Sequence, residues 1–366
     1  MLAGLSPAQF MRKHWQSSPL LVRQAFPGIT SPLRRVALFD LASSADVESR
    51  VVSRDGSQWS VRHGPFSRRA LPPAGRPNWT LLVQGLETHL DAAHELLSRF
   101  RFLPDARLDD LMLSWASAGG GVGPHLDSYD VFLLQLQGQR RWRIGRATDE
   151  TFVEGLPLRI LKHFKPEAQW VLKPGDMLYL PPRWAHDGVA VAGDCMTCSI
   201  GFRAPAAGAL ASELLTRLGE DAAADDLTMF RDAGQAATAH PGAVPPRLQR
   251  FARQAVVRAL RRPADLERAL GETLTEPKPK VWFVAAPRAD LSAGVQLSPA
   301  TRMLYDARHV YVNGESFLAR GADARRMQVL ADTQCLSAQD CLALSPSARK
   351  LLLQWLGDGW LMMGRR

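Results

Sequence analysis

The sequence is poor in cysteine, has no long apolar run and shows no targeting segment. Its four cysteines among 366 residues are too few for a disulfide framework. None of its apolar runs reaches the roughly 18 residues that a membrane-spanning helix requires. At the N-terminus no basic region precedes an apolar stretch, so we see no signal peptide. We therefore expect a cytoplasmic protein that does not enter a membrane.

Two of the cysteines, Cys195 and Cys198, form a CxxC pair without a second such pair elsewhere in the chain. Residues three apart in a strand point to opposite faces, so these two thiols are poorly placed to share one zinc ion. We expect both cysteines to have a structural role.

The charge pattern gives little support for a nucleic-acid partner. The formal net charge of +9 leaves that class of partner open. However, most of the 45 basic residues are arginines spread along the whole chain. No basic run has the interleaved aromatic residues on which single-stranded bases stack. We therefore expect no direct nucleic-acid binding.

The middle of the chain has the pattern of β-structure. Between residues 111 and 203, short apolar runs alternate with turn residues such as Gly138, Gly175 and Gly193. Many short strands at regular spacing are typical of a sandwich or small barrel, and the double-stranded β-helix (jelly roll) of the cupins fits the count. A chain of this length exceeds one compact core. We expect an α+β protein whose catalytic domain covers residues 1–203.

After residue 203 the pattern becomes helical. Residues 247–262 carry apolar residues at helical spacing, and this stripe consists of Leu248, Phe251, Ala252, Ala255, Val256 and Leu260. The stripe fits either a core or a dimer face, and the sequence does not separate the two. We expect a helical dimerisation region at 204–275, a homodimer, and a linker at 272–280.

Residues 276–366 form the third predicted domain. Asn313-Gly314 stands between two β-like runs and is a typical type I′ hairpin turn. Because helical stretches lie on either side of this hairpin, we expect a small winged-helix-like module.

The stretch GGGVGPHLDSYDVF at 119–132 suggests a metal site. His125 and Asp127 are two apart at the start of an apolar run, so on a strand both side chains point to one face. His186, in LKPGDMLYLPPRWAHDG, is a third ligand on another predicted strand. Two histidines and one carboxylate make the facial triad of non-haem Fe(II) oxygenases, which leaves positions open for a co-substrate and dioxygen.

An oxygenase of this kind commonly uses 2-oxoglutarate, whose distal carboxylate needs a cation inside the barrel. In QRRWRIG the alternation places Arg140, Trp142 and Ile144 on one face, and the two apolar residues suit the interior. Arg140 is therefore the predicted carboxylate partner, since its planar fork binds a carboxylate bidentately. Ser114 is the predicted second contact, and Ser199 is a weaker alternative.

These segments carry a resemblance to a known family. GPHLDSYDVFLLQLQGQRRWRIG and PGDMLYLPPRWAHDG resemble the JmjC-type 2-oxoglutarate oxygenases and, among them, the ribosomal oxygenases of the bacterial arginine-hydroxylase branch. HGPF at 63–66, WTLLVQG at 79–85 and SIGFRAP at 199–205 agree, so the similarity covers nearly the whole chain.

The resemblance implies a function and an architecture. It implies a JmjC barrel, a helical dimerisation region and a winged-helix-like domain. It also implies His125, Asp127 and His186 as Fe(II) ligands, Arg140 as the 2-oxoglutarate partner, and an arginine of large-subunit ribosomal protein sixteen as the substrate.

Three alternatives stay open at this point. The first is a JmjC oxygenase with another target, either a histidine hydroxylase or a lysine demethylase. The second is a cupin without oxygenase activity, and the third is a module that docks on RNA. A further expectation concerns charge: a basic enzyme with a basic substrate needs local acids at the mouth of its site, for which Asp130 is a candidate.

Overall fold

A computed structural model describes residues 1–237, 240–260, 263–285 and 290–364. Contacts divide the chain into two compact units, one of Met1–Pro205 with Pro279–Trp282 and one of Ala206–Lys278 with Phe283–Arg366. The finer division into three domains stays a prediction. Among the helices of the described residues, none is both long and apolar enough to cross a membrane.

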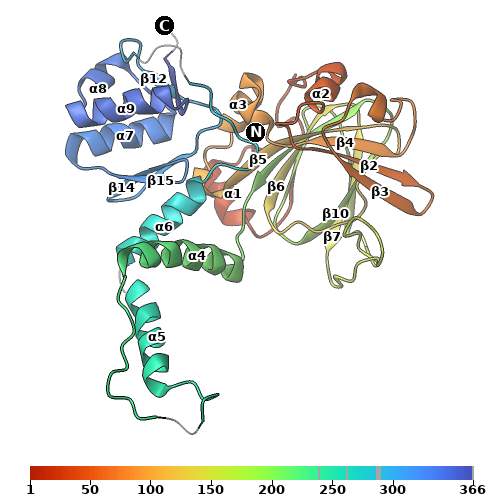
Figure 1. Cartoon of the computed structure of the whole chain (residues 1–366). Coiled ribbons are helices and arrows are strands. Elements are labelled where there is room, and N and C mark those ends of the chain that lie inside the picture. The colour runs from red at the N-terminus through yellow and green to blue at the C-terminus, as the bar shows by residue number, and fades with distance from the viewer. Residues whose placement is uncertain (238–239, 261–262, 286–289, 365–366) are drawn as a thin grey trace. The chain divides into compact units, whose positions relative to one another are not determined.

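The first unit is built on two antiparallel sheets, and Figure 1 labels several strands of each. The strands of the large sheet, in spatial order, are β1 (Leu20–Val22), β9 (Met177–Leu180), β6 (Asp130–Gln137), β11 (Cys195–Phe202), β5 (Leu108–Ala116), β4 (Trp79–Val83), β2 (Ser49–Asp55) and β3 (Gln58–His63). The small sheet consists of β10 (Trp184–Ala190), β7 (Arg140–Arg146) and β8 (Ala168–Leu172). Two packed sheets of short strands agree with the sandwich-like pattern predicted from the sequence.

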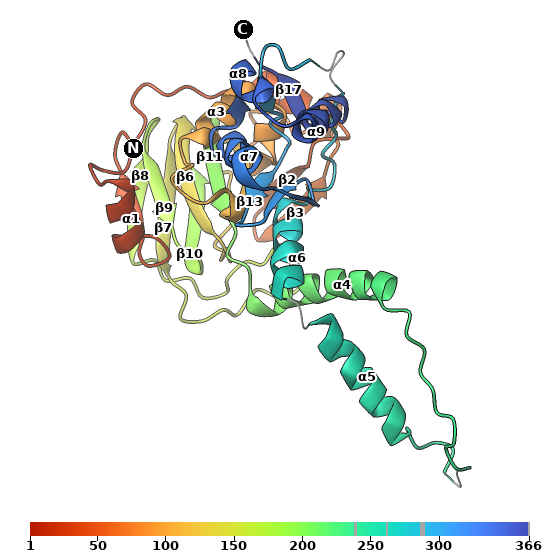
Figure 2. The same cartoon turned by 90° about the vertical axis from the view of Figure 1, so that its left-hand side faces the viewer.

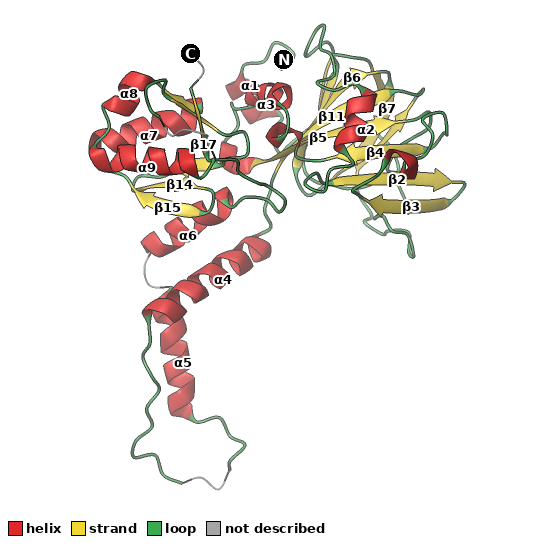
Figure 3. Cartoon of the chain, turned by 45° about the horizontal axis from the view of Figure 1, so that its top comes forward, coloured by secondary structure: helices red, strands yellow, loops and turns green. Residues whose placement is uncertain are grey.

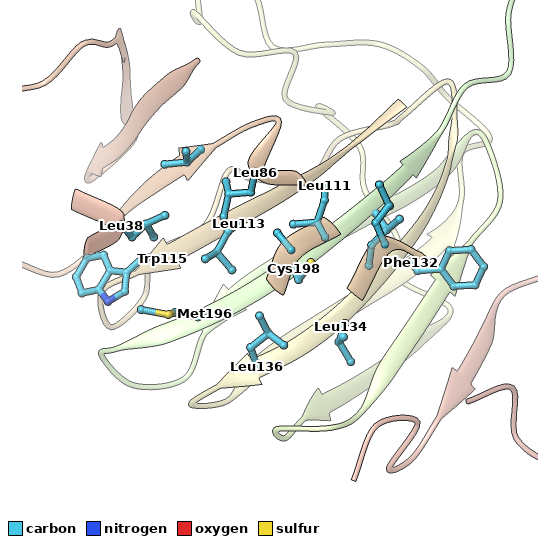
Figure 4. Packing of buried hydrophobic residues seen from close by; sticks show 14 of the residues in the cluster. Leu38, Leu86, Leu111, Leu113, Trp115, Phe132, Leu134, Leu136, Met196 and Cys198 are labelled. Atoms are coloured by element: carbon cyan, nitrogen blue, oxygen red, sulfur yellow. The ribbon is translucent and has the colours of Figure 1, made fainter. Parts of the chain in front are cut away.

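Alternation along the strands of the large sheet produces two cores. On β6, Leu134 and Leu136 face an outer core, whereas Val131 and Leu133 face the small sheet and pack with Trp142. Figure 4 shows the outer core on one side of the strands. The helices that contribute to it are α1 (Pro7–Lys13), α2 (Arg35–Leu41) and α3 (Asp91–Ser98). Burial of each large apolar side chain stabilises the fold by about 1.5–3 kcal/mol, so the outer core fixes the sheet whose inner face carries the site.

Short 3₁₀ turns complete the first unit at Arg68–Ala70, Leu86–Thr88 and Asp105–Arg107. The second unit begins with three helices, which are α4 (Ala207–Asp225), α5 (Pro246–Ala259) and α6 (Pro263–Thr275). It continues with β12 (Val295–Leu297), β13 (Met303–Tyr305), β14 (His309–Val312), β15 (Glu315–Leu318), α7 (Gly321–Thr333), β16 (Cys335–Leu336), α8 (Ala338–Leu342), α9 (Pro346–Gly357) and β17 (Leu361–Met363). The chain is thus of mixed α+β class, as predicted, and Figure 3 distinguishes its helices from its strands.

The predicted hairpin turn at Asn313-Gly314 is confirmed. β14 and β15 pair with Val312 opposite Glu315, so the loop between them has two residues. Both loop residues have positive φ angles, 50° at Asn313 and 88° at Gly314, as a type I′ turn requires.

The apolar stripe predicted at 247–262 lies on α5, apart from residues 261–262, which are outside the described part of the chain. No residue of α5 is buried, and Val256 is 59% exposed. The Phe251 ring lies 5.5 Å from that of Phe230, in the segment before the helix, and Figure 2 shows most of α5 away from the other helices. The stripe is therefore not part of a core within the described chain, and the alternative of a dimer face remains.

The linker predicted at 272–280 is wrong in its first part, because α6 continues to Thr275. Glu272 is buried and accepts hydrogen bonds from Arg217, Arg268 and Ser316. The polar composition that suggested a linker belongs to a buried ionic network, since partners distant in the sequence satisfy the charge.

Candidate active site

The structure brings His125, Asp127 and His186 together on the inner side of the two sheets. His186 lies on β10, and His125 pairs with it through two backbone hydrogen bonds of 3.0 Å. The expectation that His125 begins a strand needs correction, because β6 starts only at Asp130 and His125 forms an isolated bridge. The bridge to β10, rather than an alternating strand, sets the spacing of the three side chains.

The distances within this triad suit a single metal ion. The Asp127 carboxylate lies 3.4 Å from Nε2 of His186 and 3.8 Å from Nε2 of His125. One ligand atom from each residue lies within 4.8 Å of the other two. Two imidazoles and one carboxylate in this arrangement fit a facial triad.

Both imidazoles are oriented in the same way. Nδ1 of His125 lies 2.9 Å from the carbonyl oxygen of Gly123, and Nδ1 of His186 lies 2.9 Å from that of Trp184. Because a carbonyl oxygen only accepts, each Nδ1 carries the proton, and each Nε2 faces Asp127 as the atom that would bind a metal. Metal-ligating histidines are typically fixed by such a second hydrogen bond, so the donor set fits a bound metal.

The protonation states also suit a ligand set. Burial raises the pKa of Asp127, but the hydrogen bond from His186 and the charge of both imidazoles outweigh it and hold the pKa at about 2. Burial together with the neighbouring His186 lowers the pKa of His125. Burial lowers the pKa of His186, but its hydrogen bond to Asp127 and the charge of that carboxylate outweigh it and raise the pKa. Asp127 is therefore ionised and His125 neutral near neutral pH, and a bound metal would replace a proton on His186.

Arg140 points to the interior, as the alternation along β7 predicted. It is only 5% exposed, and within the described chain its Nε and Nη2 atoms have no hydrogen-bond partner. A buried guanidinium without a partner is costly, so the position calls for an anion. The predicted 2-oxoglutarate carboxylate fits this need.

Arg141 and Arg143 of β7 lie on the opposite face from Arg140. Arg141 is exposed, and Arg143 pairs with Asp187 at 2.6 Å. Ser114 lies opposite Thr197 on the inner face of the large sheet and donates to the Thr197 carbonyl at 3.2 Å. The inner face also carries Ser199, which pairs with Met112.

The prediction that Asp130 is an acid at the mouth of the site is wrong. Asp130, the first residue of β6, is fully buried, and its carboxylate accepts hydrogen bonds from Tyr179, Gln16 and Arg107. The extended register of β6 turns Asp130 toward the outer core rather than the cavity.

Two residues of the site escaped the sequence reasoning. Tyr129 forms a hydrogen bond with Asp127, and burial together with the charges of Asp127 and Asp110 raises its pKa. Asp110 is a buried acid four residues before Ser114 on β5, so both point to the inner face. Strand alternation, applied backward from Ser114, would have indicated Asp110.

The predicted opposite orientation of the two cysteines in CxxC is confirmed. Cys198 packs in the outer core, whereas Cys195 packs with Ala116 and Ala190. Both thiols are buried and free.

Comparisons with known proteins agree with this site. Residues 95–210 match the family described as JmjC domain, and residues 254–362 match the ROXA-like winged helix. The ribosomal protein uL16 3-hydroxylase of Escherichia coli (strain K12) is 34% identical over 272 residues, which cover 74% of this chain and 71% of that protein. Ribosomal oxygenase 1 of Gallus gallus is 29% identical over 215 residues, which cover 54% of this chain and 34% of that protein.

Solved structures match over almost the full length. The X-ray structure of E. coli YcfD superposes with a TM-score of 0.84 at 30% identity and covers 98% of both chains. A structure of YcfD, a ribosomal oxygenase from Escherichia coli, in complex with cobalt and 2-oxoglutarate has a TM-score of 0.81 at 30% identity and covers 98% of both chains.

Proposed function

Since this chain belongs to the JmjC ribosomal oxygenases, we propose that it hydroxylates an arginine side chain of large-subunit ribosomal protein uL16, with Fe(II) and 2-oxoglutarate. The family is the one that the sequence resembled. The observation that carries the proposal is the position of the buried Arg140 on the same inner surface as the His125, Asp127 and His186 cluster, with its Nε and Nη2 atoms lacking a hydrogen-bond partner within the described chain. A relative with almost the same length and fold is known with cobalt and 2-oxoglutarate bound.

The three residues of the cluster would hold the metal through Nε2 of each histidine and an oxygen of Asp127. Bound iron, together with 2-oxoglutarate and dioxygen, supplies the oxidising power that replaces an unactivated C–H bond by C–OH and releases succinate and carbon dioxide. The chain itself fixes the ligand orientation through the carbonyl groups of Gly123 and Trp184 and keeps Asp127 ionised.

Arg140 would bind the distal carboxylate of the co-substrate, with Ser114 as a second contact. Both side chains are buried, and a charge-assisted hydrogen bond is stronger away from water. The ring of Trp142 lies beside the Arg140 guanidinium and limits the directions in which that group can turn.

Asp110 and Tyr129 form the substrate side of the proposed site. Asp109, the neighbouring acid, is already paired with Arg203 at 3.0 Å. Asp110 accepts hydrogen bonds from the Gln84 side chain and the Gly85 N–H, each at 3.4 Å. It points inward and is electrostatically coupled to Tyr129, which reaches Asp127. A carboxylate at this place complements the guanidinium of a substrate arginine, and it provides the local attraction that a basic enzyme needs for a basic substrate.

We also propose the finer architecture. Residues 1–203 form the catalytic domain, residues 204–275 a helical dimerisation region, and residues 276–366 a winged-helix-like domain. The exposed apolar stripe on α5 supports a homodimer, since an apolar helix face of this kind is favoured at an interface. The proposed place of action is the cytoplasm, where ribosomal proteins are made.

Mass spectrometry of the host's large-subunit proteins tests the function. Three strains are compared: the wild type, a deletion strain, and the deletion strain complemented with His186→Ala. One arginine of uL16 should be about 16 Da heavier in the wild type than in the other two. The wild-type gene should give the modified protein, and His186→Ala should give the unmodified one. An unmodified uL16 in all strains would contradict the proposed substrate.

One alternative keeps the same chemistry with another target. A relative named bifunctional lysine-specific demethylase and histidyl-hydroxylase NO66, from Drosophila persimilis, is 28% identical over 207 residues, 52% of this chain and 29% of that protein. The same spectra distinguish it, because the added oxygen would lie on a histidine, or a methyl group would be lost from a lysine.

A further inference from the structure

Gly123 lies between two side chains that come from distant parts of the first unit. A Cβ atom at this position would be 2.4 Å from Cδ1 of Ile160 and 3.2 Å from the indole ring of Trp59. Ile160 is buried in the segment between β7 and β8, and Trp59 lies on β3, the last strand of the large sheet. The φ angle of Gly123 is +79°, in the left-handed region, so glycine is favoured both by the backbone and by the space.

The backbone of this position reaches the metal cluster directly. The carbonyl oxygen of Gly123 is the acceptor for Nδ1 of His125 at 2.9 Å. The next carbonyl, that of Pro124, accepts from the backbone N–H of Leu161 at 2.8 Å, one residue beyond Ile160. Ile160 and Leu161 therefore lie against Gly123 and Pro124, the two residues that precede His125.

The two side chains are themselves held in place. The Arg54 guanidinium carbon lies 5.5 Å from the centre of the Trp59 ring, and the two residues pair directly across β2 and β3. Ile160 is followed by a bridge between Leu161 and Phe152, which closes its segment. Neither side chain can leave Gly123 without disturbing these contacts.

We propose that Trp59 and Ile160 clamp Gly123 so that its carbonyl holds the His125 imidazole in the orientation required for metal binding. The inference rests on the proposed function, because it assumes that His125 is a metal ligand. Trp59, Gly123 and Ile160 are positioning residues, since none of them touches the metal. They act through the hydrogen bond from His125, whose counterparts at other metal sites are worth about 10- to 100-fold in metal affinity.

The test is titration of the full-length apoprotein with Co(II), followed by the absorption of the bound ion. Gly123→Ala should weaken Co(II) binding by about tenfold or more. Gly155→Ala is the matched control, because Gly155 has nearly the same φ angle of +73° but no atom within 4 Å of an added Cβ. It should leave the affinity unchanged.

A second substitution separates the clamp from backbone strain. Ile160→Val removes Cδ1, the atom that an added Cβ at position 123 would meet. The double variant Gly123→Ala with Ile160→Val should therefore recover most of the lost affinity. Failure to recover it, or a Gly123→Ala variant that binds Co(II) as tightly as Gly155→Ala, would overturn the clamp.

Two further variants keep the test decisive. If Gly123→Ala does not fold, Trp59→Ala and Ile160→Ala replace it. In each of these variants, the folded protein should bind Co(II) several-fold more weakly than the wild type does. Unchanged affinity in both would reject the clamp. His125→Ala distinguishes the two levels of the argument: if it keeps wild-type affinity, the proposed metal site is wrong and not merely the clamp.

Discussion

The guanidinium carbon of Arg140 lies 5.7 Å from the centre of the Trp142 ring, two residues along the inner face of β7. The Trp142 ring lies in turn 5.8 Å from the ring of His186, centre to centre. A single aromatic side chain therefore lies between the buried cation and a residue of the metal cluster. This neighbourhood supports the proposed binding of 2-oxoglutarate between Arg140 and the metal cluster.

Replacing Arg140 should weaken binding of the co-substrate. Arg140→Ala should raise the KM for 2-oxoglutarate by about 10- to 100-fold, since charge-assisted hydrogen bonds contribute about 1.5–3 kcal/mol each. The dependence of turnover on 2-oxoglutarate concentration measures this. Arg141→Ala is the matched control, because Arg141 lies on the same strand but is exposed. Equal KM values for the two variants would contradict the proposed role.

Replacing Asp110 should affect the protein substrate instead. Asp110→Asn should raise the KM for a uL16 peptide containing the target arginine by roughly tenfold, because one charged contact is lost. The uncoupled turnover of 2-oxoglutarate without peptide should stay as in the wild type. Asp109→Asn is the control, since Arg203 already neutralises that neighbouring acid. A larger effect at Asp109 than at Asp110 would reverse the assignment.

The parts of the site that the sequence predicted are those set by local spacing. Period-two alternation placed Arg140 on the inner face of its strand, and a short motif located His125 and Asp127. The third ligand, His186, comes from another strand. The turn residues that precede it, in LKPGDMLYLPPRWAHDG, were enough to indicate it. The resemblance to JmjC oxygenases carried the function, which residue pattern alone would have left among several classes.

The parts that the sequence did not predict depend on partners far along the chain. Glu272 looked like a linker residue because its partner Arg217 is 55 positions away. Asp130 looked like an accessible acid, but Tyr179 and Arg107 satisfy its carboxylate in a buried place. The role of α5 was undecided because an apolar stripe has the same period in a core and at an interface.

The apolar stripe of α5 predicts the oligomeric state. Val256→Glu should convert a dimer to a monomer or weaken it by at least about 100-fold, because a charge would be buried in an apolar interface. Analytical ultracentrifugation of the full-length chain measures this. Arg250→Glu, on the opposite side of the same helix, should leave the dimer intact. A wild-type chain that sediments as a monomer would contradict the proposed interface.

The buried network around Glu272 predicts a loss of stability on truncation. The Glu272 side chain is 8% exposed and pairs with both Arg217 and Arg268. Glu272→Ala should lower the free energy of unfolding by roughly 2–3 kcal/mol, since it leaves two guanidinium groups partly buried without this partner. Glu276→Ala is the control, because Glu276 also pairs with Arg217 but is 63% exposed. It should cost less than about 1 kcal/mol in chemical denaturation.

The carboxylate of Asp176 predicts a dependence of stability on pH. Its side chain is buried and accepts hydrogen bonds from the backbone N–H groups of Lys173 and Gln24 and from Arg23. Burial alone raises the pKa of Asp176, but these donors outweigh it and hold the pKa below its ordinary value. The ionised form is therefore better stabilised in the folded chain than in the unfolded one.

The sign of the effect follows from that lowered pKa. Above the unfolded pKa of about 3.9, the full stabilisation is present, and it is lost as the pH falls through the lower folded pKa. Asp176→Asn should therefore lower the free energy of unfolding by about 2 kcal/mol at pH 7, and the difference from the wild type should shrink in acid. Urea denaturation at several pH values measures both. Asp55→Asn, at the exposed end of β2, is the control and should change the free energy of unfolding little at any pH. If the difference between Asp176→Asn and the wild type were the same at every pH, the charge of Asp176 would not be the cause of the stabilisation.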